Sequence, residues 1–125
     1  MPGPYVLTID VGTGSGRAAL FDRSGRQVSI GKREWTPEPV SRYPGALNFN
    51  PREAWRLLVE CIREAMGKVE ASGKDVAGVT ATSIREGMVL YDKGKNEIWA
   101  CPNADGRARA GHLRGLCPPS LQGPA

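Results

Sequence analysis

A glycine- and hydroxyl-rich turn between two apolar runs is the feature that most constrains the fold of this chain. The first apolar run leads into Asp10, the turn occupies residues 12–16, and the second apolar run ends at Asp22. Two short apolar runs separated by a glycine-rich turn predict a strand, a tight turn and a second strand.

The turn has the groups needed to contact an anion such as phosphate. The backbone N–H groups of Gly12 and Gly14 can approach it closely, because glycine has no Cβ and tolerates positive φ. The hydroxyls of Thr13 and Ser15 add two more donors. Asp10, at the strand end, is placed to hold a divalent metal through its oxygens or a metal-bound water. The alternative is a flexible hairpin without a ligand, since short glycine motifs also occur by chance.

Two well-known phosphate-binding motifs do not fit. A P-loop requires lysine and a hydroxyl residue after its last glycine, whereas Gly16 is followed by Arg17. A dinucleotide-binding fingerprint requires a helix after the glycines, whereas residues 17–22 form a short apolar run that favours a strand. Arg17 is suited to neutralise charge on a transferring phosphoryl group. Its alternative role is a salt bridge on the strand surface.

One amphipathic helix is predicted over residues 51–71. Asn50 can cap it, Pro51 suits its first turn, and Glu53 can complete a capping box. Apolar residues then recur at helical spacing and predict one buried stripe, in which tryptophan and methionine are core residues rather than parts of a cofactor site. The stripe comprises Trp55, Leu58, Val59, Ile62, Met66 and Val69.

The remaining pattern predicts an α/β fold. Strands are expected at residues 5–11, 17–22, 27–35, 76–84, 88–92 and 97–100. The first three form an antiparallel meander, and the proline-rich residues 36–49 form a loop. Residues 76–84 are apolar, small and β-branched, which predicts a central strand buried on both faces. We expect a mixed sheet of at least five strands, with the helix packed on one face through Trp55, Leu58, Ile62 and Met66.

A second group of polar residues follows the predicted central strand. Arg85 and Glu86 come directly after it, where ligands bind in open α/β sheets. Such a pair offers fixed donors and an acceptor to the hydroxyl pattern of a sugar or polyol, whereas the alternative is a solvated turn pair. Asn103 and Asp105 provide further hydroxyl partners, but Asp105 can instead form a local cap and a salt bridge with Arg107.

Several of these segments together resemble a known family, the FGGY carbohydrate kinases of the actin-like ATPase superfamily. The opening signature of the family is matched by Asp10, Gly12, Thr13, Ser15, Arg17, Phe21 and Asp22. Residues 83–92 and 98–108 look like its sugar-binding segments, and their amino-acid sequence most resembles that of the autoinducer-2 kinases. The resemblance covers roughly residues 5–110 in consistent order.

The resemblance implies a ribonuclease H-like (actin-like ATPase) N-terminal subdomain and transfer of the ATP γ-phosphate to a hydroxyl of a small sugar or polyol, with Mg²⁺ as cofactor. The nucleotide residues would be Asp10, Gly12, Thr13, Gly14, Ser15 and Arg17, with Asp10 also serving the metal. The acceptor residues would be Arg85, Glu86, Asn103 and Asp105. The catalytic base and adenosine pocket of the family belong to segments that match nothing in this chain. No catalytic residue is therefore assigned, and the chain alone is expected to be inactive.

Length and composition agree with a fragment of such a kinase. The 125 residues allow one small domain. We expect residues 1–110 to be a partial kinase domain and residues 111–125 to be an irregular tail, disordered or foreign in origin. Two rival interpretations remain: a non-catalytic remnant that binds a ligand weakly or merely folds, and another actin-like ATPase. The second rival is disfavoured by the Arg85–Glu86 and 103–105 segments.

Charge and cysteine content exclude other classes. The net charge is +4, but the basic residues are dispersed and do not alternate with aromatics, which argues against nucleic-acid binding. No apolar stretch predicts a membrane span or a signal peptide, so a cytoplasmic protein is expected. The three cysteines have no metal-binding spacing, and Cys61 is predicted on the buried face of the helix. The sequence does not indicate an oligomeric state.

Overall fold

The structure is a computed structural model that describes residues 3–107. These residues form two compact units, and each is described by itself. The first unit contains the residues up to Thr36 together with Asn50–Arg85, and the second contains Pro37–Phe49 and the residues from Glu86 onward. The predicted irregular tail at residues 111–125 lies outside the described residues. No helix in the described part is long and apolar enough to cross a membrane.

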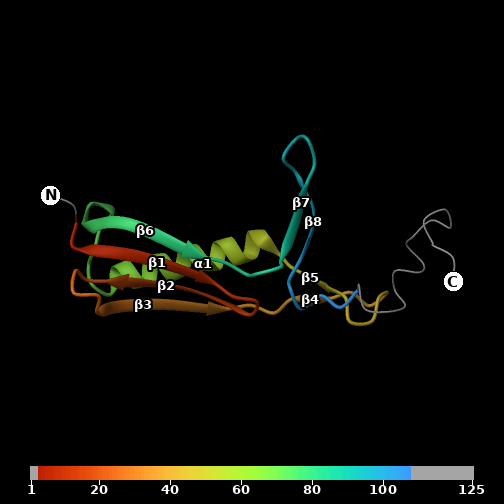
Figure 1. The fold of residues 1–125 in the computed structure, drawn as a ribbon, viewed down its shortest axis with the longest axis horizontal. Coiled ribbons are helices and arrows are strands. Elements are labelled where there is room, and N and C mark those ends of the chain that lie inside the picture. Colours follow the sequence, from red (N-terminus) through yellow and green to blue (C-terminus); the bar gives the residue numbers. More distant parts are fainter. Residues whose placement is uncertain (1–2, 108–125) are drawn as a thin grey trace. The chain divides into compact units, whose positions relative to one another are not determined.

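The first unit is built on a four-stranded mixed sheet in the order β3-β2-β1-β6 (Figure 1). Strands β1 (Tyr5–Val11), β2 (Ser15–Phe21) and β3 (Gln27–Glu34) form the predicted antiparallel meander. Strand β6 (Val76–Thr82) then pairs with β1 in parallel. The α/β fold class, with an opening meander and a mixed sheet, is therefore confirmed.

Helix α1 (Pro51–Gly67) begins where the sequence predicts and packs against β2 and β3. The Asn50 side chain caps it by accepting a hydrogen bond from the Glu53 N–H at 3.0 Å. The Glu53 carboxylate does not complete a capping box, because it pairs with Arg56 instead. The helix ends at Gly67, earlier than the predicted residue 71, and the short 3-10 helix η1 (Gly73–Asp75) leads into β6.

Small residues allow α1 to lie very close to the sheet. A Cβ added to Gly31 would lie 2.2 Å from the Cys61 carbonyl oxygen, so only glycine fits this position on β3. The Ser29 hydroxyl donates to the Ala65 carbonyl at 2.7 Å, which satisfies a buried polar group at the same contact. The core between helix and sheet comprises Leu7, Ala18, Leu20 and Cys61.

The predicted buried stripe of α1 is wrong at Trp55, which is 63% exposed. The residues that the helix buries are Ala54, Leu58, Cys61 and Ala65, whereas Ile62, Met66 and Val69 are partly buried beside them. The cause is the close approach of the helix to the sheet. The contact is centred on small side chains, and a tryptophan lies to the side of that stripe.

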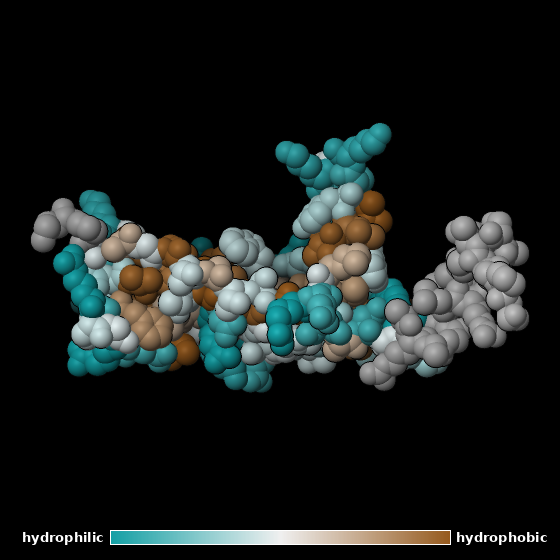
Figure 2. Space-filling view, in the orientation of Figure 1, coloured by the Kyte–Doolittle hydropathy of each residue, from teal (hydrophilic) through white to brown (hydrophobic). Residues whose placement is uncertain are grey.

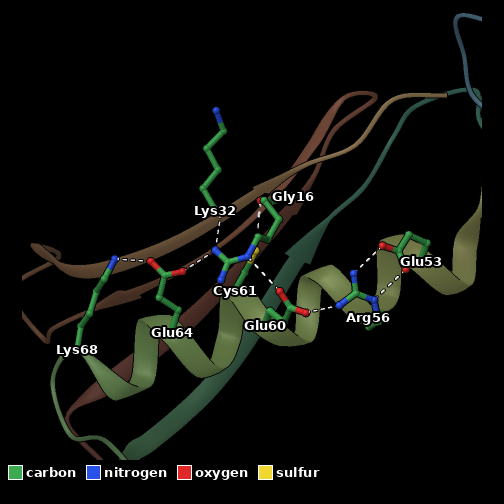
Figure 3. A network of polar contacts seen from close by, with 9 residues as sticks. Gly16, Lys32, Glu53, Arg56, Glu60, Cys61, Glu64 and Lys68 are labelled. Carbon is green, nitrogen blue, oxygen red and sulfur yellow. Dashed lines mark hydrogen bonds and ion pairs between the residues drawn. The ribbon is translucent and has the colours of Figure 1, made fainter.

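An ion-pair network links α1 to β3 on the surface (Figure 3). The Arg33 guanidinium reaches Glu64 at 2.5 Å and Glu60 at 3.2 Å, and the bond to Glu64 is the main cause that raises the pKa of Arg33. Lys68 pairs with Glu64, and Arg56 joins Glu60 to Glu53. Since these side chains are partly exposed, each pair adds little stability.

The predicted burial of β6 and the predicted five-stranded sheet are also wrong. In the part of the chain that the structure describes, β6 is an edge strand whose only partner is β1, and its residues are mostly exposed, with Val79 at 62%. The composition of a strand shows that it is suited to burial, but burial also requires neighbours that cover it.

In its described residues, up to Arg107, the second unit contains two short antiparallel pairs. Strands β4 (Glu38–Pro39) and β5 (Leu47–Asn48) pair within the predicted loop, and β7 (Met88–Tyr91) pairs with β8 (Glu97–Cys101). The β7–β8 hairpin was predicted, and its turn is closed by Asp92, which accepts the Asn96 N–H at 2.8 Å. Figure 2 shows hydrophobic residues along this hairpin, which agrees with the exposure of Leu90 and Ile98.

We predict that Leu58→Ala lowers the free energy of unfolding of the first unit by about 2–5 kcal/mol, because it leaves a cavity beneath a close helix–sheet contact. Trp55→Ala should change it by no more than about 0.5 kcal/mol, as for other surface positions. Urea denaturation of both variants tests this. A larger loss for Trp55→Ala than for Leu58→Ala would contradict the observed orientation of α1.

Candidate functional site

The β1–β2 turn is held by its own backbone. The Gly12 N–H donates to the Ser15 carbonyl at 2.7 Å, so this predicted phosphate donor is already used inside the hairpin. Positive φ, which the sequence suggested for this turn, occurs among the described glycines only at Gly25 and Gly45. A Cβ at position 12 would lie 3.3 Å from the Ser15 carbonyl oxygen, a tight contact that favours glycine there.

Trp35 contacts the turn from the end of β3. Its backbone N–H donates to the Gly14 carbonyl at 3.1 Å, and its indole Nε1–H donates to the Thr13 carbonyl at 3.0 Å. Its ring lies over Gly16, where an added Cβ would lie 2.6 Å from a ring carbon. The sequence interpretation treated Trp35 only as a strand residue. The register of the meander was the signal that could have placed it. Ser15 pairs with Glu34, the last residue of β3, so Trp35 lies beside Gly14.

Asp10 and Arg17 face each other across β1 and β2. They are register partners, and the Arg17 Nε lies 2.8 Å from the Asp10 Oδ2. Since Gly16 and Ala18 point toward α1, Arg17 between them points to the opposite face of the sheet. The structure thus brings a candidate metal ligand and a candidate phosphate ligand together. Both are accessible, with side chains 41% and 54% exposed.

Asp22, the last residue of the signature, has a structural role in the β2–β3 turn. Its carboxylate accepts hydrogen bonds from Ser24 and from the backbone N–H of Arg26. The Ser24 hydroxyl bond is the main cause that lowers the pKa of Asp22. The Asp22 carboxylate therefore stabilises the β2–β3 turn and is not placed to bind a ligand.

The groups around the turn could hold Mg²⁺ only together with water and the phosphates of a bound ligand. Within residues 3–107, no group of three or more His, Cys, Asp or Glu residues is arranged to hold a metal ion by itself. Asp10 offers one accessible carboxylate. Mg²⁺ is commonly bound by one or two carboxylates together with water and the phosphates of a substrate, so a single aspartate beside a phosphate-binding turn is compatible with it.

Arg85 follows the strand that pairs in parallel with the strand of Asp10. The parallel pairing places Thr82 opposite Asp10, so β1 and β6 both end at the same edge of the sheet, and Arg85 follows three residues later. Arg85 and Glu86 are exposed, and neither side chain forms an ion pair with another residue in the described part of the chain. Glu86 has φ of 61°, a left-handed conformation that is uncommon for this residue type and often occurs at functional sites.

Asp105 is largely committed to contacts within the second unit. One carboxylate oxygen accepts the Leu47 N–H at 2.7 Å, and the other pairs with the Arg107 Nε at 2.7 Å. Arg107 also lies over the Trp99 ring, 4.6 Å from its centroid. The local salt bridge, one of the two alternatives for Asp105, is therefore present.

Asn103 is exposed. The roles of Glu86, Asn103 and Asp105 in acceptor binding, and whether they face Asp10, stay predictions.

The two described cysteines are not placed for nucleophilic chemistry. Burial is the main cause that raises the pKa of Cys61 and that of Cys101, so both thiols are protonated at neutral pH. The Cys61 thiol donates to the Gly16 carbonyl at 3.5 Å and thereby joins α1 to the strand that follows the turn.

Comparison with known proteins identifies the family to which the chain is similar. Residues 5–110 match the family model described as the FGGY family of carbohydrate kinases, N-terminal domain. The autoinducer-2 kinase of Klebsiella pneumoniae is 44% identical over 104 residues, which are 83% of this chain and 20% of that protein. The autoinducer-2 kinase of Salmonella typhimurium is 42% identical over 106 residues, which are 85% and 20%. The chain thus spans about a fifth of the length of these relatives.

Solved structures show the same fold. A xylulose kinase from Rhodospirillum rubrum superposes with a TM-score of 0.72 at 24% identity, covering 90% of this chain and 23% of that one. A gluconate kinase from Lactobacillus acidophilus gives a TM-score of 0.71 at 18% identity, with 81% and 20% covered. At these identities the likeness establishes the fold alone.

The sheet order, the packed helix and the glycine turn beside the parallel strand pair define the N-terminal α/β unit of an actin-like ATPase fold. Within that class, the match of residues 5–110 to a single family model identifies the family. This chain belongs to the FGGY family of carbohydrate kinases, and its residues 5–110 match the N-terminal domain of that family.

We predict that Asp105→Ala destabilises the second unit by about 1–3 kcal/mol, because it leaves the partly buried Leu47 N–H without its acceptor and removes the ion pair with Arg107. Exchange of the Leu47 amide hydrogen should become faster in proportion, whereas Lys93→Ala, on an exposed turn, should leave it unchanged. Hydrogen exchange read by NMR measures both. An unchanged Leu47 exchange rate in Asp105→Ala would show that this contact does not hold the unit together.

Proposed function

We propose that this chain is the N-terminal part of a kinase that transfers the γ-phosphate of ATP to a hydroxyl of a small sugar or linear polyol in the cytoplasm. The observation that carries the proposal is the shared edge of β1 and β6. The glycine turn and Asp10 end one strand there, and Arg85 follows the other. Phosphoryl transfer requires a phosphate site beside an acceptor site, and this edge supplies candidates for both.

The phosphate end would be held by the turn. The hydroxyl of Thr13 and the N–H groups of Gly14 and Ser15 would contact phosphate oxygens, and Arg17 would add charge that stabilises the transferring group. When bound, Mg²⁺ would neutralise phosphate charge, with Asp10 orienting it directly or through water. Arg17 now pairs with Asp10, so it is already within reach of the same ligand.

The acceptor end would be held by Arg85, Glu86 and Asn103. A guanidinium donates only, a carboxylate accepts only and an amide does both, and these are the groups that can bind the hydroxyls of a sugar or polyol. The autoinducer-2 precursor is the acceptor that we propose first, because relatives 44% and 42% identical to this chain are named autoinducer-2 kinases. Asp105 would act indirectly, by holding Arg107 and the β5 segment in place.

The rival proposal is a domain that binds a ligand without turnover. A general base must accept the proton of the attacking hydroxyl, and no described residue is assigned to that role. The chain also spans only about a fifth of its relatives. We therefore propose that catalysis belongs to the longer kinase and that the 125-residue chain by itself binds but does not phosphorylate.

The experiment is an ATP-dependent phosphorylation assay on the purified chain, with pentoses, polyols and the autoinducer-2 precursor as acceptors, combined with calorimetric titration of Mg·ADP. No turnover and measurable Mg·ADP binding are expected. Asp10→Asn should weaken the Mg²⁺-dependent part of the binding by about 1–2 kcal/mol, as expected for loss of a hydrogen bond or metal contact from a charged group.

Asp92→Asn is the matched control, since it removes the same charge at the β7–β8 hairpin and should leave Mg·ADP binding unchanged. Reproducible turnover by the chain would refute the assignment of catalysis to other segments. Mg·ADP binding that is equally weakened by both variants would argue against a specific site at Asp10.

A further inference from the structure

We propose that Trp35 is a positioning residue that fixes the direction in which the β1–β2 turn presents its N–H groups to a phosphate. The proposal rests on the proposed function of the turn, and it adds a residue that makes no contact with the ligand. The ligand whose binding it would favour is the polyphosphate group of a nucleotide.

Two hydrogen bonds from one residue fix two successive carbonyl groups of the turn. The indole Nε1–H of Trp35 binds the Thr13 carbonyl at 3.0 Å, and its backbone N–H binds the Gly14 carbonyl at 3.1 Å. The second bond continues the β2–β3 ladder beyond the Ser15–Glu34 pair. The first comes from a side chain, so it depends on which residue occupies position 35.

The orientation of the N–H groups follows from peptide geometry. In a planar trans peptide, the N–H of each residue points opposite to the carbonyl of the residue before it, and every described peptide bond is trans. Because the Thr13 and Gly14 carbonyls point at Trp35, the N–H groups of Gly14 and Ser15 point away from it. The Gly14 carbonyl points along the sheet toward the Trp35 N–H after β3, so the Ser15 N–H points toward β1, the strand that carries Asp10. The Thr13 carbonyl points at the indole, which lies over Gly16 on the α1 face, so the Gly14 N–H points away from that face, as Arg17 and Asp10 do.

The Trp35 ring is itself held by the core. It packs over Gly16, and a Cβ at Gly16 would also lie 3.5 Å from a methyl group of Leu58 on α1. Any larger residue at position 16 would displace the indole. The direction of the turn is thereby linked to the helix–sheet contact instead of depending on loop residues alone, which is the kind of pre-organisation that reduces the cost of binding an anion.

The first test uses Trp35→Phe, which keeps an aromatic ring over Gly16 and the backbone N–H but removes the indole donor. Inorganic pyrophosphate without metal is the probe, and binding is followed by the ¹⁵N–¹H signals of the complete chain. We expect Trp35→Phe to weaken pyrophosphate binding by about two- to tenfold, the factor that one hydrogen bond supplies. The Gly14 and Ser15 amide signals should shift even without the probe.

Trp55→Phe is the matched control, because Trp55 is 63% exposed on α1 and has no part in the turn. It should change neither the affinity nor the two amide signals. Equal effects of the two variants, or unchanged Gly14 and Ser15 signals in a folded Trp35→Phe, would overturn the proposal. A general loss of stability would shift signals throughout the first unit, whereas loss of positioning is confined to the turn.

A second measurement uses the wild-type chain and does not depend on how a variant folds. The indole N–H of Trp35 should exchange with solvent more slowly than that of Trp55, and pyrophosphate should slow it further, because binding and turn orientation are thermodynamically linked. Exchange as fast as that of Trp55 would overturn the proposal. If the indole is protected and Trp35→Phe shifts the turn signals but the wild-type chain binds no pyrophosphate, positioning by Trp35 is upheld and the proposed function of the turn fails.

Discussion

The close contact between α1 and the small residues of β2 and β3 is the constraint on which the first unit depends. Gly31 lets the helix backbone approach the strand, and Cys61 links the helix to the Gly16 carbonyl. Leu58 and the Trp35 ring meet at Gly16, directly after the turn. The position of the helix therefore determines how the turn is supported, and a candidate phosphate site depends on a packing contact between small side chains.

Local signals in the sequence were sufficient for the elements and their order. The glycine turn predicted the first hairpin, Asn50 predicted the start of α1, and the successive short strands predicted the meander. Hydrophobicity was a poorer guide to burial. Trp55 has a far larger apolar side chain than Ala54, yet the alanine is buried and the tryptophan is exposed. The short distance between helix and sheet favours small side chains at this contact, and that distance cannot be known from the helix alone.

The burial of β6 could not be predicted for a related reason. Its small and β-branched residues are suited to a strand covered on both faces, but the cover comes from other segments of a fold and not from the strand itself. Asp10 and Arg17 were selected as candidate ligands from the signature, and the structure pairs them in a surface salt bridge, which was the alternative role for Arg17. Their part in ligand binding stays a prediction. The contact of Trp35 was missed because it depends on register. Trp35 is 22 residues from Thr13 in sequence, and only strand pairing places it beside Gly14.

The central claim is that this chain supplies the phosphate turn and part of the acceptor site of an FGGY kinase. The most direct test replaces the matching segment of the Klebsiella pneumoniae autoinducer-2 kinase by residues 5–110 and measures phosphorylation of the autoinducer-2 precursor. The account predicts an active chimera, in which Asp10→Asn lowers kcat and Arg85→Ala mainly raises KM for the acceptor. A folded chimera that binds ATP but shows no turnover, or an active one that is indifferent to both substitutions, would contradict it.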